Sequence, residues 1–140
     1  MEGTRILAID FGEKRIGLAI TLPMLNIPQP LKTVERENLW HEMNEIFKNY
    51  NIGTVVIGIP LHIDGGDTKH TAVIKELAAE ISIKFNVPVK LWDERSTTRS
   101  AEQLMHAFGK KPSRNKKMVD KIAAAIILEE YLSGLCSGGL

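Results

Sequence analysis

Three acidic residues stand where a carboxylate is unexpected in a small globular protein. Asp10 directly follows the apolar run 6–9, and Glu94 comes at the end of the predicted strand 89–92. Asp120 falls in the predicted first turn of a helix that is apolar on nearly all sides. Active sites of α/β sheets usually assemble at strand ends. We therefore expect a helix packed across that edge of the sheet to bring Asp120 to the other two acids.

A cluster of three carboxylates needs a neutralising partner. Two carboxylates about 5 Å apart repel by about 3 kcal/mol at an effective dielectric constant near 20. Three such pairs cost on the order of 10 kcal/mol, which is comparable with the whole stability of a small domain. Oxygen ligands with no histidine in register favour Mg²⁺ or Mn²⁺. Magnesium held by carboxylates suits phosphoryl transfer, because the metal activates water and stabilises the leaving oxygen.

Each acid also has a purely structural interpretation. Asp10 can open a turn at Phe11 and Gly12, because an aspartate side chain bonds its own backbone there. Glu94 can cap the helix that follows it. Asp120 can interact with the positive end of a helix dipole, which contributes about 0.3–1 kcal/mol. Taken singly, none of the three acids requires an active site.

Cationic side chains accompany every one of these acids. Residues 110–121 carry six cationic side chains and one acid, a local charge of +5, although the net charge of the chain is only +1. A basic segment on a mildly acidic body can bind phosphates, and the alternative is a solvated, flexible loop. The candidate phosphate contacts are Lys14, Arg15, Arg95, Arg114, Lys116, Lys117 and Lys121.

The composition indicates one soluble domain over residues 1–140. A chain of 140 residues with 44% apolar residues can build one core. The longest wholly apolar run, 122–128, is far shorter than the roughly 20 residues of a membrane span, and no signal peptide precedes the first strand. The lone Cys136 excludes an internal disulfide. We expect a cytoplasmic protein whose residues 133–140 form a flexible tail.

The hydrophobic periodicity predicts a mixed α/β fold. Short continuous apolar runs are typical of buried strands, and apolar residues spaced by three and four are typical of helices. Three antiparallel strands followed by two crossover units give a mixed five-stranded sheet with helices on both faces. The predicted strands are 6–9, 16–20, 31–34, 54–59 and 89–92, and the predicted helices are 39–50, 73–85, 101–108 and 117–132.

Four stretches of the sequence resemble the YqgF family, the pre-16S rRNA nucleases or Holliday-junction-resolvase-like proteins. They occur in the family's order and cover nearly the whole chain. Four motifs in register are highly specific, whereas any one alone is weak. The stretches are 8–19 (AIDFGEKRIGLA), 58–61 (GIPL) with Asp64-Gly65, 92–98 (WDERSTT) and 117–124 (KMVDKIAA).

The resemblance implies an RNase H-like fold and a cytoplasmic, metal-dependent nuclease that matures the 5′ end of 16S rRNA. It gives Asp10, Glu94 and Asp120 the positions of the catalytic acids, with Asp10 and Glu94 holding the metal and Asp120 completing the site. Related junction resolvases often carry two acids three residues apart on the final helix. Here the residues three either side of Asp120 are Lys117 and Ala123. The missing carboxylate weakens the case for resolving DNA junctions and leaves the number of metal ions open.

Other functions stay open beside the predicted endonuclease on structured RNA. The same chemistry could act on branched DNA, or the chain could be a non-catalytic RNA-binding module. Asp10-Phe11-Gly12 is also similar to the phosphate loop of actin-like ATPases. Those enzymes need a second, similar domain, which 140 residues do not provide. The sequence predicts no oligomeric state.

Overall fold

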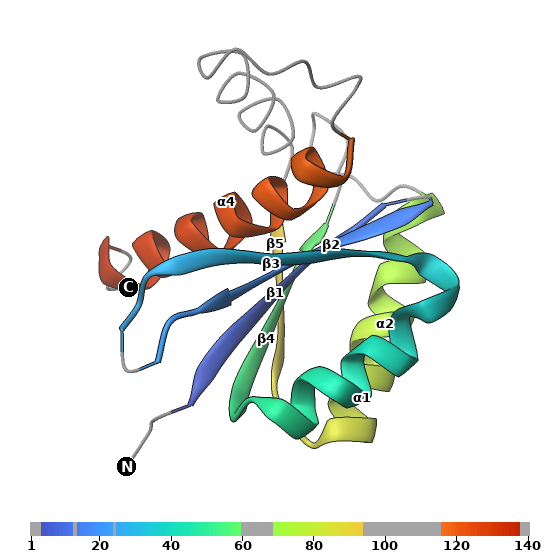
Figure 1. Cartoon of the computed structure of the whole chain (residues 1–140), viewed down its shortest axis with the longest axis horizontal. Helices are drawn as coiled ribbons and strands as arrows, with labels where there is room; N and C mark the ends of the chain where they lie inside the picture. The colour runs from blue at the N-terminus through green and yellow to red at the C-terminus, as the bar shows by residue number, and fades with distance from the viewer. Residues whose placement is uncertain (1–3, 13, 24, 60–68, 94–115, 138–140) are drawn as a thin grey trace.

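The computed structural model describes residues 4–12, 14–23, 25–59, 69–93 and 116–137 (Figure 1). The predicted helix 101–108 lies outside these residues. The elements are β1 (Arg5–Phe11), β2 (Arg15–Thr21), β3 (Pro28–Glu35), a 3-10 turn η1 (Arg36–Asn38), α1 (Leu39–Asn49), β4 (Ile52–Ile59), α2 (Lys69–Phe85), β5 (Val89–Asp93) and α4 (Lys116–Ser137).

The five strands form one mixed sheet in the order β3-β2-β1-β4-β5. The short link between β1 and β2 makes these two strands antiparallel neighbours, and β3 pairs with β2 in the same sense. β4 and β5 run parallel to β1, because α1 and α2 carry the chain back between the strands. The predicted mixed five-stranded sheet is confirmed.

Helices cover both faces of the sheet, as predicted. α1 and α2 lie on one face and α4 crosses the other (Figure 1). Successive residues of a strand point to opposite faces. Leu7, Ile9 and Phe11 of β1 accordingly enter the large core with α1 and α2, whereas Ala8 packs in a second core with Ala124 of α4 and its neighbours. Because Asp10 lies two residues after Ala8, it belongs to the face that α4 covers.

Two elements are longer than their sequence patterns predict. β3 begins at Pro28 instead of near residue 31, since an edge strand tolerates prolines that cannot donate to a ladder. α4 runs to Ser137, so the predicted end near Leu132 is wrong and residues 133–137, expected to be loose, are helical. Gly134 does not end the helix. A Cβ there would lie 2.8 Å from the ring of Trp92, so this glycine permits close packing on β5.

α4 is fastened to three strands of the sheet. At Gly17 of β2 an added Cβ would lie only 1.9 Å from the carbonyl oxygen of Asp120, so the two backbones are in direct contact. The Thr33 hydroxyl of β3 donates to the Lys117 carbonyl. At the opposite edge of the sheet, on the same face, the indole Nε1 of Trp92 on β5 donates to Glu130 Oε2 at 3.1 Å. These contacts fix the position of the helix across the sheet.

We predict that Gly17→Ala destabilises the fold by about 1–3 kcal/mol, the usual cost of overpacking. The new methyl group would meet the backbone of α4, which cannot move without losing its other contacts with the sheet. Urea denaturation followed by circular dichroism measures the change. A comparison variant, Gly53→Ala on β4, places its methyl group against the side chain of Thr4, so it separates a clash with a side chain from the clash with the backbone of α4. A Gly17→Ala protein within about 0.5 kcal/mol of wild type would contradict this prediction.

Candidate active site

Asp10 lies in the centre of a row of residues that crosses the whole sheet. Its register partners are Gly17 on β2 and Gly58 on β4. Gly17 in turn pairs with Thr33 on β3, and Gly58 pairs with Trp92 on β5. Residues directly opposite one another on neighbouring strands share a face of the sheet. Asp10 therefore carries the only side chain among the three central positions of the row, with a glycine on either side.

α4 places Asp120 directly over this row. The contact between Gly17 and the Asp120 carbonyl seats one turn of the helix on the strand next to Asp10. Both aspartates are partly buried. Two acids from opposite ends of the chain thus lie on the same face of the sheet, over adjacent strands. α4 crosses the sheet, and its backbone at Asp120 contacts Gly17, the residue that pairs with Asp10.

The side chain of Asp120 is held by an ion pair. Arg15 Nε donates to Asp120 Oδ2 at 3.0 Å, and each side chain is 24% exposed. Arg15 lies two residues before Gly17 on β2 and hence on the same face. An ion pair with this much solvent contact contributes at most about 1 kcal/mol to stability. Its main effect is to fix where the Asp120 carboxylate lies.

The helix-dipole interpretation of Asp120 is wrong. Over the residues that the structure describes, α4 begins at Lys116, and its first turn holds no acid. Asp120 falls in the second turn, where the dipole of the helix has little effect on a charge. The charge that accounts for its position is the guanidinium of Arg15 on the sheet.

Several predicted site residues lie outside the described part of the chain. These are Glu94, Arg95 and Arg114, and β5 ends at Asp93, the residue before Glu94. Among the described residues, no three acidic, histidine or cysteine side chains gather closely enough to hold a metal. The meeting of all three acids therefore stays a prediction.

The other described cationic candidates lie on the turn between β1 and β2 and at the start of α4. Lys14 is exposed at the turn between β1 and β2. Lys117 is exposed on α4, and Lys121 is partly buried immediately after Asp120. Lys116 is the first residue of α4. Positions three and four apart on a helix share a side, so Lys117 lies on the same side of α4 as Asp120.

Sequence reasoning missed two residues that build this site. Gly17 was not distinguished from its apolar neighbours, although a glycine inside a strand often marks a close backbone approach. The sequence predicts Arg15 only as a phosphate contact, whereas in the structure its Nε donates to Asp120. The alternation of Arg15, Gly17 and Ala19 along β2 was the available signal, because it places all three on one face.

The donor set of this site fits a divalent metal such as Mg²⁺ or Mn²⁺. Asp10 and Asp120 offer carboxylate oxygens, the ligands that these hard cations prefer. The glycine at position 17 lets the α4 backbone come down onto the sheet, which a Cβ would prevent. Both aspartates are partly buried, so a cation bound there would be screened less by solvent than at an open surface.

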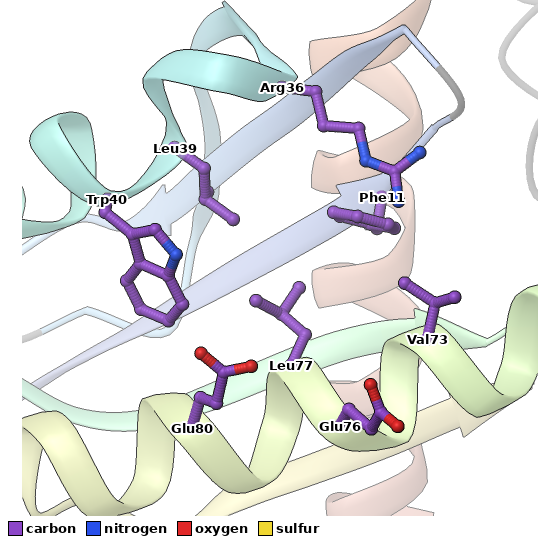
Figure 2. Close-up of a pocket in the computed structure, with 8 residues that line it drawn as sticks. All are labelled: Phe11, Arg36, Leu39, Trp40, Val73, Glu76, Leu77 and Glu80. Carbon is purple, nitrogen blue, oxygen red and sulfur yellow. The ribbon is translucent and has the colours of Figure 1, made fainter.

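A separate hollow of about 190 Å³ lies on the other face of the sheet (Figure 2). It lies between α1 and α2, with Phe11 from the end of β1 in its lining. The guanidinium of Arg36 stacks over the Phe11 ring at 4.4 Å from its centre. Because Phe11 points away from the face that carries Asp10, this hollow does not belong to the acidic site. Its lining residues are Phe11, Arg36, Leu39, Trp40, Val73, Glu76, Leu77 and Glu80.

None of the helices in the described residues is long and apolar enough to cross a membrane.

A family model and individual relatives both match this chain over most of its length. Residues 4–134 match the model of the RuvX family, described as Holliday junction resolvase. A protein of Maridesulfovibrio salexigens is 39% identical over 132 residues, covering 92% of this chain and 98% of that protein. One from Caldicellulosiruptor bescii is 41% identical over 133 residues, covering 91% and 95%. Both relatives bear the name "Putative pre-16S rRNA nuclease".

Solved structures of RuvC from Thermus thermophilus share the fold. One, in complex with a Holliday junction substrate, superposes with a TM-score of 0.58 at 13% identity over 95% of this chain and 96% of that chain. A second RuvC structure gives a TM-score of 0.56 at 11% identity over 94% of this chain and 96% of its own. At such low identity the likeness concerns the fold alone, which is RNase H-like, as the sequence motifs imply. With the family model matched from residue 4 to residue 134 and relatives near 40% identity, the chain belongs to the RuvX family, the YqgF-type proteins that its motifs resemble.

Proposed function

We propose that this protein is a metal-dependent endonuclease that hydrolyses phosphodiester bonds in structured RNA, with the 5′ region of precursor 16S rRNA as its substrate. The observation that carries the proposal is the seating of Asp120 over the strand next to Asp10. The names of the relatives from two bacteria support the choice of substrate. A substrate of this kind places the protein in the cytoplasm.

In this proposal the acidic residues bind the metal and the lysines bind the phosphates of the substrate. Asp10, Asp120 and Glu94 would hold Mg²⁺ or Mn²⁺, which supplies an activated water and charge stabilisation of the leaving oxygen when bound. Asp10 belongs to a central strand and is therefore fixed by the sheet. Lys117 and Lys121 lie within one turn of Asp120, where they can bind the phosphates that flank the scissile bond.

The surroundings of Asp120 favour RNA over junction DNA. The fourth carboxylate that many junction resolvases carry would have to occupy position 117 or position 123. Lys117 is exposed and cationic, and Ala123 is fully buried in a cluster with Val119. Branched DNA remains the second candidate, because the family model is described as a Holliday junction resolvase.

We predict that Asp10→Asn reduces metal-dependent cleavage of a precursor 16S rRNA leader by at least about 100-fold, the lower end of the loss expected when one main catalytic group is removed. The amide keeps the shape of the side chain but loses the charge that attracts the cation. Gel analysis of the cleaved leader in Mg²⁺ and in Mn²⁺ measures the loss. Thermal unfolding is expected to match wild type.

The control for this variant is Glu80→Gln. It makes the same change of charge on α2, on the opposite face of the sheet, and should leave cleavage within about twofold of wild type. A folded Asp10→Asn protein with full activity would refute the assignment. RNA binding without cleavage by the wild-type protein, across titrations of both metals, would instead establish a non-catalytic RNA-binding module.

A side-by-side cleavage assay distinguishes precursor rRNA from branched DNA as the substrate. We expect the wild-type protein to cleave the precursor leader at least about tenfold faster than a four-way DNA junction of equal concentration, because position 123 offers no further carboxylate. Rates are compared under single-turnover conditions at the same salt and metal concentrations. Faster cleavage of the junction would establish the resolvase function in place of RNA processing.

Lys117→Gln tests the phosphate contacts on α4. Each lost contact lowers the slope of log affinity against log salt by about 0.7–0.9. We expect that decrease for Lys117→Gln, measured by fluorescence anisotropy with the RNA leader in EDTA, so that no cleavage occurs. The matched control, Lys48→Gln on α1, removes the same charge on the opposite face and should keep the wild-type slope. Equal slopes for all three proteins would remove Lys117 from the proposed binding surface.

A further inference from the structure

The ion pair between Arg15 and Asp120 joins the sheet to the helix at the centre of the proposed site. Through it a side chain of β2 reaches the carboxylate of Asp120, at 3.0 Å from Arg15 Nε to Oδ2. Because both side chains are one quarter exposed, solvent and ions can reach the pair. A partly exposed ion pair contributes little to folding, so stability alone does not account for an arginine at this position.

Arg15 also has a second acid beside it. Glu35 of β3 is its direct register partner, and side chains of directly opposed residues lie within reach of one another. Glu35 is exposed, whereas Asp120 is partly buried. In the structure Arg15 Nε bonds the more buried carboxylate, and the guanidinium can turn toward Glu35 if Asp120 takes another partner.

We propose that Arg15 is a positioning residue that acts as the built-in counter-charge of Asp120. It holds this carboxylate over the sheet while no divalent cation is bound, and a divalent cation that uses Asp120 competes with it. The inference rests on the proposed function, because it takes Asp120 as a ligand of that cation. It changes the role of Arg15 from a phosphate contact to a residue that acts through Asp120.

The competition follows from charge. A divalent cation at Asp120 is repelled by the guanidinium on the same carboxylate. At about 6 Å in water, this repulsion lowers the affinity for the cation by about tenfold without salt and by about threefold at physiological salt. Removal of Arg15 also frees rotation of the Asp120 side chain, which weakens cation binding by a smaller factor. The effect of the charge is therefore expected to dominate.

The test is calorimetric titration of Mn²⁺ into the full chain without nucleic acid. Arg15→Gln is expected to bind Mn²⁺ more tightly than wild type, by about threefold at physiological salt and by up to about tenfold at low salt. Arg15→Lys, which keeps the charge, should stay within about twofold of wild type. The matched control is Lys14→Gln, which removes the same charge one residue earlier on the exposed turn and should change the affinity less than twofold. In an Asp120→Asn background, Arg15→Gln should have no effect beyond twofold.

Unchanged or weaker Mn²⁺ binding by Arg15→Gln would overturn the proposal, and so would equal tightening by Lys14→Gln, which would indicate a general effect of charge. These results would leave the nuclease function intact if Asp10→Asn still abolishes cleavage. Tighter binding by Arg15→Gln in a protein that cleaves no nucleic acid would support the role of Arg15 and refute the nuclease. A wild-type protein that binds no Mn²⁺ would overturn both.

Discussion

The contact between the backbones of β2 and α4 at Gly17 is the constraint on which the site depends. A helix normally packs on a sheet through its side chains, but here the carbonyl of Asp120 occupies the space of a missing Cβ. This contact seats the helix over the strand adjacent to Asp10. Hydrogen bonds from Thr33 and Trp92 hold α4 on either side of it, so the helix cannot slide along the sheet.

The two faces of the sheet differ in the size of the side chains that they carry. The face toward α1 and α2 carries large apolar side chains such as Leu7 and Ile9, which supply most of the buried surface. The face toward α4 carries small residues near the site: Ala8, Ala19 and Gly17 are all buried. Small residues let a helix come close and leave room for charged groups, because they fill little space. Stability therefore comes mainly from one face, and the candidate site lies on the other.

The sequence patterns predict the sheet, its mixed pairing and the helices on both faces, because each depends on local periodicity and on short connections. These predictions fail where a contact with a residue far away in the sequence determines the local structure. Gly134 is typical of a helix end, but it lies inside α4 because Trp92 packs against it. The bond from Arg15 to Asp120 joins opposite ends of the chain, and no spacing predicts it. Motifs locate the acids along the chain, whereas the tertiary contacts determine what each acid touches.

The central claim is that Asp10 and Asp120 share one divalent cation across the contact between β1, β2 and α4. A crystal structure of the wild-type protein with Mn²⁺, with the ion located by its anomalous scattering, tests this most directly. The account predicts one shared Mn²⁺ within about 2.0–2.3 Å of a carboxylate oxygen from each aspartate, whether or not a second ion is present, close to the bond lengths of small divalent cations. Ions bound by only one of the two aspartates, or by neither, with none shared by both, would contradict it.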